Sequence, residues 1–123
     1  MRSPESVIEA QLEAYNRRDI DAFAATYAPD IRIMDIDESR PSLIGIEALR
    51  EVFGQKTFAK AGLNAKIRSR MVVGNKVVDH EITTWDGSPE PLESLVVYEV
   101  VNELIKNVWF FDPTQPTTTK TKA

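Results

Sequence analysis

The apolar positions of the first 30 residues follow a helical period and predict two helices in succession. In the first helix, Ile8, Leu12 and Tyr15 fall at i, i+4 and i+7 and therefore share one face. The second helix is expected to begin after Asp19, a suitable N-cap, and to end at Pro29. Its apolar face comprises Ile20, Phe23, Ala24 and Tyr27.

After Pro29 the apolar period changes from helical to two, which predicts a β-strand. Ile31, Ile33 and Asp35 share one face of this strand, so a carboxylate lies beside two isoleucines. A buried carboxylate is unfavourable unless it is paired, neutralised or used in chemistry. Asp35 is therefore the first candidate for a functional residue.

The remaining pattern predicts one more helix and four more strands. A polar loop at residues 37–42 precedes a helix from about Gly45, whose apolar face carries Ile46, Leu49 and Phe53. Gly62 is expected to end the helical region. The strands are expected at residues 64–73, 76–85, 92–101 and 104–111, joined by a type II′ turn at Gly74-Asn75, a loop at residues 86–91 and a short turn at Asn102-Glu103.

This order of elements predicts an α+β fold in one domain. A curved antiparallel sheet with the helices on one side would enclose an apolar cavity of the kind in which small ligands bind. The domain is expected to cover residues 1–112. Residues 113–123 are rich in threonine and lysine without an apolar period, and are expected to form a polar tail.

Composition narrows the function classes. The 123-residue chain has a net charge of -4 and no basic stripe, which argues against nucleic-acid binding. It has no cysteine and a single histidine, His80, so disulfides, thiolate nucleophiles and zinc sites built from these residues are excluded. No apolar run approaches the roughly 20 residues of a membrane span, and the N-terminus lacks a signal-peptide core. We expect a cytoplasmic protein that holds no metal and needs no cofactor.

Five segments carry recognisable motifs: AYNRRDIDAF at 14–23, YAPDI at 27–31, IGIEALR at 44–50, VYEV at 97–100 and LIKNVWF at 104–110. Together they resemble the nuclear transport factor 2-like superfamily, which includes ketosteroid isomerase and the SnoaL-like polyketide cyclases. The resemblance implies a cone-shaped, cystatin-like fold, in which a strongly bent antiparallel sheet wraps around the N-terminal helices, and a homodimer.

The resemblance also implies roles for particular residues. Alignment of the YAPDI segment places the catalytic base of ketosteroid isomerase on Asp35. The two positions that supply its oxyanion donors hold Gln11 and, approximately, Val96 in this chain. Tyr15 lies one helical turn from Gln11. The chemistry implied by the resemblance is therefore retained only at the base.

Two hypotheses for function follow. The first is an isomerase, cyclase or dehydratase acting on an apolar carbonyl compound, with Asp35 as base and His80, which titrates near neutral pH, as its partner. The second is a non-catalytic ligand-binding or dimerisation module of the same fold. Epoxide hydrolases of the superfamily use an Asp–Arg–Asp set. This chain contains residues of these types, but the sequence does not show that they lie together. The expected substrate-binding residues are Tyr15, Tyr27, Phe53, Asn107 and Trp109, although periodicity leaves open which face of the last strand is concave.

Overall fold

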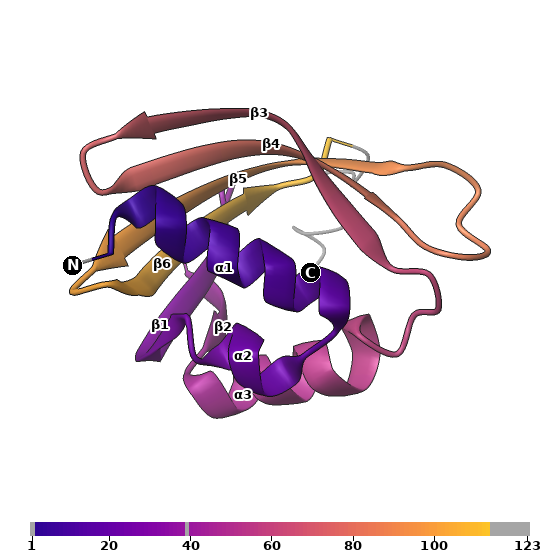
Figure 1. Ribbon diagram of the computed structural model, residues 1–123, viewed down its shortest axis with the longest axis horizontal. Coiled ribbons are helices and arrows are strands. Elements are labelled where there is room, and N and C mark those ends of the chain that lie inside the picture. The colour runs from indigo at the N-terminus through magenta and orange to yellow at the C-terminus, as the bar shows by residue number, and fades with distance from the viewer. Residues whose placement is uncertain (1, 39, 114–123) are drawn as a thin grey trace.

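The computed structural model describes residues 2–38 and 40–113, and the predicted tail falls outside them apart from Pro113. Three helices and a π-helical turn pack against a six-stranded sheet (Figure 1). The helical elements are α1 (Pro4–Arg17), α2 (Ile20–Ala24), α3 (Ile46–Val52) and η1 (Phe53–Thr57). The strands are β1 (Tyr27–Asp35), β2 (Pro41–Ile44), β3 (Asn64–Val73), β4 (Lys76–Thr84), β5 (Leu92–Val101) and β6 (Leu104–Phe111).

Side-chain caps determine where the first two helices begin. The Ser3 hydroxyl accepts from the backbone N–H of Ser6, and the Asp19 carboxylate accepts from that of Ala22. Arg18, in the left-handed conformation at φ 56°, ends α1 and turns the chain sharply into α2. Pro29, however, does not end the second helix. The chain joins the sheet earlier, because the N–H of Ile105 donates to the carbonyl of Thr26.

The strand order is β2-β1-β6-β5-β4-β3. All neighbours are antiparallel except β1 and β6, which are parallel. β2 was expected to be part of a polar loop, and its short sequence shows no clear alternation. It forms because Leu43 pairs with Ile33 of β1 across the sheet, a contact that local sequence does not reveal.

The predicted turns are confirmed. Gly74 has φ 59° while Asn75 keeps a negative φ, as a type II′ turn requires. Asn102 and Glu103 both have positive φ, 52° and 66°, which is the type I′ pattern. Both turn types match the right-handed twist of the strands they join. The strands from β3 to β6 agree with the expected bounds to within one residue.

The π-helical turn after α3 brings two aromatic rings to one site. The N–H of Phe58 donates to the carbonyl of Phe53 five residues earlier, at 2.8 Å. This spacing turns both rings toward Phe23, whose centroid lies 4.9 Å from that of Phe53 and 5.3 Å from that of Phe58. The apolar face of the third helix therefore extends beyond Phe53 to Phe58.

The helix α1 lies against the concave face of the curved sheet, and α2 and α3 pack together at one end of it (Figure 1). Each of these elements contributes a fully buried side chain to one core. Burying such a side chain stabilises the fold by about 1.5–3 kcal/mol. Apolar core residues with 0% exposure are Val7, Ile8, Ala14, Phe23, Ile31, Leu49, Val77 and Ile105. The architecture confirms the predicted α+β fold with a bent sheet around the N-terminal helices. Within the described residues, no helix has the length and apolarity to cross a membrane.

Candidate functional site

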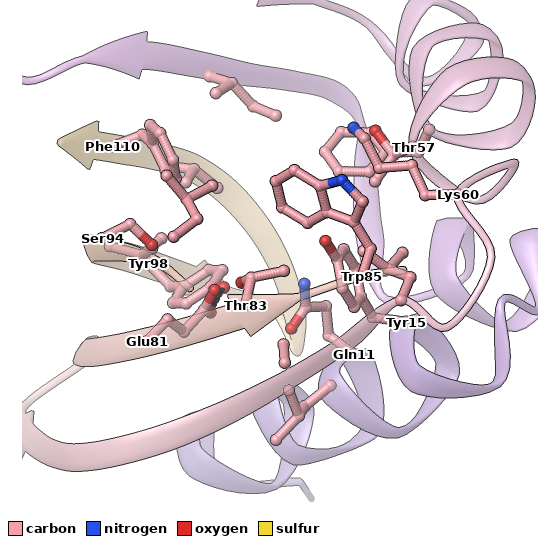
Figure 2. A pocket seen from close by; sticks show the side chains of 18 of the residues that line it. Gln11, Tyr15, Thr57, Lys60, Glu81, Thr83, Trp85, Ser94, Tyr98 and Phe110 are labelled. Carbon is pink, nitrogen blue, oxygen red and sulfur yellow. Dashed lines mark hydrogen bonds between the residues drawn. The ribbon is translucent and has the colours of Figure 1, made fainter. Parts of the chain in front are cut away.

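A cavity of about 250 Å³ lies between α1 and the concave face of the sheet. Its walls are mainly apolar, with a small number of polar groups, which is the usual composition of a small-molecule site. The apolar lining includes Leu12, Phe53, Leu63, Val96, Val108 and Phe110. The polar groups come from Gln11, Tyr15, Tyr27, Thr57, Lys60, Glu81, Thr83, Ser94 and Tyr98 (Figure 2).

The alternation of β4 divides its polar residues between two faces of the sheet. Asp79, Glu81 and Thr83 point to the concave side, while His80 points to the outer side. Glu81 is the only carboxylate that lines the cavity among the described residues. The strand thus places one acid in an apolar enclosure.

The environment of Glu81 disfavours its ionised form, so that neutral and ionised forms coexist near neutral pH. Burial is the main cause that raises the pKa of Glu81 to about 7, and the negative charge of Asp79 adds to it. The hydroxyl of Tyr98 donates to Oε2 of Glu81 at 3.1 Å, and this hydrogen bond, with the more distant charge of Arg70, opposes the rise. A carboxyl group with this pKa can both take and give a proton at neutral pH.

Asp79 has a different environment. It is fully buried and accepts two hydrogen bonds from the Arg70 guanidinium, at 2.6 Å from Nε and 2.9 Å from Nη2. Nη1 of the same guanidinium donates to Glu9 of α1 at 2.6 Å. Arg70 therefore ties β3, β4 and α1 together beside the cavity. The hydrogen bond to Asp79 is the main cause that raises the pKa of Arg70, so this side chain remains a cation.

Three tyrosines with neutral hydroxyls line the same cavity as Glu81. Burial raises the pKa of Tyr15, Tyr27 and Tyr98, and the charge of Glu81 raises each of them further. Tyr27 accepts a hydrogen bond from the Gln11 amide at 3.1 Å. The Tyr15 hydroxyl has no hydrogen-bond partner within residues 2–38 and 40–113, so it remains available as a donor to a ligand.

The structure brings three of the expected site residues to the cavity, namely Tyr15, Tyr27 and Phe53. Gln11 and Val96, the positions aligned with the oxyanion donors of ketosteroid isomerase, line it as well. These five positions therefore lie on the wall of one cavity.

Asp35 and His80 do not meet, contrary to the expectation that they face one cavity. Asp35 is the last residue of β1 and lines a separate recess formed with the turn that follows it. His80 lies on the outer face of the sheet, with Nε2 2.5 Å from Oε2 of Glu93. The period-two pattern assigned each residue to one face of its strand, but it did not show whether that face borders the cavity.

Asn107 and Trp109 also lie away from the cavity. Val108 and Phe110, their neighbours along β6, line the cavity, so the alternation directs Asn107 and Trp109 to the other face. Asn107 donates to Glu99 at 2.7 Å. The concave face of the last strand is therefore the one that carries Val108 and Phe110.

Glu81 is the residue that sequence reasoning missed. Its signal was present, because Asp79, Glu81, Thr83 and Trp85 form one face of a predicted strand. A strand face this polar is normally expected to face solvent. Only the position of α1 shows that this face is the concave one. Within the described residues, no group of three or more potential His, Asp or Glu ligands is arranged to hold a metal ion.

Comparison with known proteins assigns the chain to a family. The SnoaL-like domain model matches residues 8–108. A cystatin-fold protein from Novosphingobium aromaticivorans shares 26% identity with a TM-score of 0.79, over 89% of this chain and 98% of its own. An NTF2-like protein from Cytophaga hutchinsonii shares 11% identity with a TM-score of 0.75, over 98% and 96%.

An LEH-like epoxide hydrolase from Mycobacterium tuberculosis shares 18% identity with a TM-score of 0.72, over 87% of this chain and 80% of its own. These likenesses show a common fold, and no curated protein matches the sequence significantly. Since the family model spans most of the chain and the fold agrees with it, the protein belongs to the SnoaL-like domain family of the nuclear transport factor 2-like superfamily.

Proposed function

We propose that the cavity binds a small apolar carbonyl compound and that Glu81 transfers a proton on it. One observation carries this proposal: a carboxyl group with a pKa of about 7 lies in a largely apolar cavity. Such a group is poised to act as base and then as acid at neutral pH. This assignment replaces Asp35 with Glu81 as the base and keeps the isomerase, cyclase or dehydratase class.

In the proposed reaction, ionised Glu81 takes a proton from the carbon next to the substrate carbonyl, and the electron pair moves onto the carbonyl oxygen. The Tyr15 hydroxyl, which burial keeps protonated, donates a hydrogen bond to that oxygen. Glu81 then returns the proton to a carbon of the resulting enolate. If the enolate is conjugated with a second double bond, return to the far carbon of that system gives an isomer. If Glu81 first exchanges its proton with solvent, return to the original carbon replaces the α-proton with one from solvent.

Proton exchange provides a test that does not require the natural substrate. The α-protons of 2-tetralone in D₂O are followed by NMR with the wild-type protein and with Glu81→Gln. The expected result is exchange catalysed by the wild type and a loss of about 100-fold or more in Glu81→Gln, the scale of general acid–base catalysis. Tyr15→Phe should lower the rate by a smaller factor.

The matched control is Glu93→Gln, the same substitution on the outer face of the sheet, which should leave the exchange rate unchanged. Asp35→Asn decides between the two candidate bases. Exchange that is lost in Asp35→Asn and retained in Glu81→Gln would return the role to Asp35. If the wild type binds 2-tetralone without exchanging its protons, the ligand-binding module without catalysis would be the better description.

A further inference from the structure

The two ends of the cavity differ in polarity and in access to solvent. Figure 2 shows Thr57, Lys60 and Trp85 at one end and Glu81, Ser94 and Tyr98 at the other. Ser94 is 2% exposed and Tyr98 is 3% exposed, whereas Lys60 is exposed. The carboxyl group of Glu81 thus lies at the closed end, and an ammonium group lies at the open end.

Lys60 is held at this end by its own backbone and by Trp85. Its N–H donates to the carbonyl of Thr57 at 3.1 Å, which makes Thr57 and Lys60 parts of one turn. Nζ lies 5.0 Å from the centroid of the Trp85 ring, a cation–π arrangement that keeps the ammonium group beside the cavity.

The neighbouring segment is fixed just as closely. The N–H of Asp86 donates to the carbonyl of Ala61 at 2.8 Å, which joins the turn containing Lys60 to the end of β4. The Asp86 carboxylate packs directly on Gly62, where a Cβ would lie 2.3 Å from Oδ1. Only glycine fits there, since the position also has φ +74°. The turn that carries Lys60 is therefore well defined.

Within residues 2–38 and 40–113, the ammonium group of Lys60 has no carboxylate partner. None of the ion pairs formed within the described part of the chain includes Lys60, although Asp86 is near in the fold. Among the described lining residues, Lys60 is also the only cation. A single unpaired cation on a mainly apolar wall favours a ligand that carries one negative charge.

We propose that Lys60, with Thr57 and Trp85, binds the anionic group of the ligand, so that the ligand is a small amphipathic carboxylate. Its apolar body would lie along the wall of the cavity, with the carboxylate at the open end. A volume of about 250 Å³ is below the range of about 300–1,000 Å³ typical of drug-sized ligands, which favours a body of one or two rings. The position of the reacting carbonyl near Glu81 rests on the proposed function, whereas the carboxylate site does not.

The test compares two probes of the same shape, 3-phenylpropanoate and its neutral amide, 3-phenylpropanamide, by isothermal titration calorimetry at low salt. The wild type should bind the acid about fivefold more tightly than the amide, as a partly exposed charged hydrogen bond would provide. Lys60→Met should abolish this preference while leaving the affinity for the amide within twofold. Lys60→Arg should retain it, and added salt should weaken it.

Lys56→Met is the matched control, since Lys56 lies in η1 and does not line the cavity. It should behave as the wild type. The proposal is overturned if the wild type binds neither probe, if it does not prefer the acid, or if Lys60→Met keeps the preference. Loss of the acid preference with intact proton exchange would overturn the carboxylate site alone. Failure of exchange with an intact preference would overturn only Glu81 as the base.

Discussion

Asp79 and Glu81 are two carboxylates on the same face of one strand, two residues apart, yet their surroundings suit them to different tasks. Asp79 is fully buried and receives two hydrogen bonds from the Arg70 guanidinium. Glu81 receives one hydrogen bond, from the neutral hydroxyl of Tyr98. The two acids differ both in burial, since Glu81 is only half-buried, and in the charge of the partner.

The comparison shows how a partner determines what a buried acid can do. A guanidinium offsets the loss of hydration of the Asp79 carboxylate and joins it to Glu9 of α1, so this pair acts as a structural link. A tyrosine hydroxyl supplies a hydrogen bond but no charge, so burial still raises the pKa of Glu81 to about 7. The structural acid and the proposed catalytic acid therefore differ in whether a cation faces them.

Removal of the charge of Asp79 should have the largest effect on the stability of the fold. Asp79→Asn leaves a guanidinium that is 10% exposed, with Glu9 at 2.6 Å and Glu5 at 4.0 Å as its remaining counter-charges. Loss of one partner from a buried ion pair costs about 3–5 kcal/mol, and we expect the free energy of unfolding in urea to fall by about 3 kcal/mol. A loss below about 1 kcal/mol would show that Arg70 is adequately paired without Asp79.

The pH dependence of stability should show the cost of burying Glu81. The folded-state pKa of about 7 lies above the 4.5 of an unperturbed glutamate, so the stabilisation is complete below pH 4.5 and is lost as pH rises through 7. The shift corresponds to about 3 kcal/mol as an upper figure. Urea unfolding from pH 4.5 to 8 should show Glu81→Gln gaining stability relative to the wild type as pH rises. A constant difference would contradict the raised pKa.

Tyr98→Phe should make ionisation of Glu81 still less favourable, which increases the difference between Glu81 and Asp79. The hydroxyl of Tyr98 stabilises the ionised carboxylate, so its removal should raise the pKa of Glu81 above 7. The free energy of ionising Glu81 should rise by up to about 1.5–3 kcal/mol, the range for a hydrogen bond to a charged group. The carboxyl titration followed by carbon-13 NMR measures it directly. A midpoint that stays constant or falls would mean that Tyr98 does not control this group.

The smallest effect is expected on the outer face of the same strands. Glu93→Gln removes the carboxylate from the exposed pair with His80, in which Glu93 is 51% exposed. Exposed pairs contribute about 0.2–1 kcal/mol, so the midpoint of urea unfolding should change little. The Glu81 titration should be unaltered, because the two groups lie on opposite sides of the sheet. A shift in that titration would show that the two faces are electrostatically coupled.

The sequence by itself determined most of the fold. The cap Asp19 predicts where α2 begins, and Gly74 predicts the turn between β3 and β4. These features are local, because a cap or a turn depends on a few consecutive residues. The end of α2 and the strand β2 were not predicted, since both depend on partners from distant parts of the chain, as with the bond from Ile105 to Thr26.

The candidate site depended on tertiary structure. Periodicity separated Glu81 from His80 on β4 and Val108 from Trp109 on β6, but a period of two defines two faces without saying which one is inside. The curvature of the sheet and the packing of α1 against it make one face the wall of a cavity. The same packing removes water from Glu81 and places Arg70 beside Asp79. The sequence shows that β4 carries two acids on one face. The tertiary structure pairs Asp79 with a cation and leaves Glu81 to line the cavity beside a neutral hydroxyl.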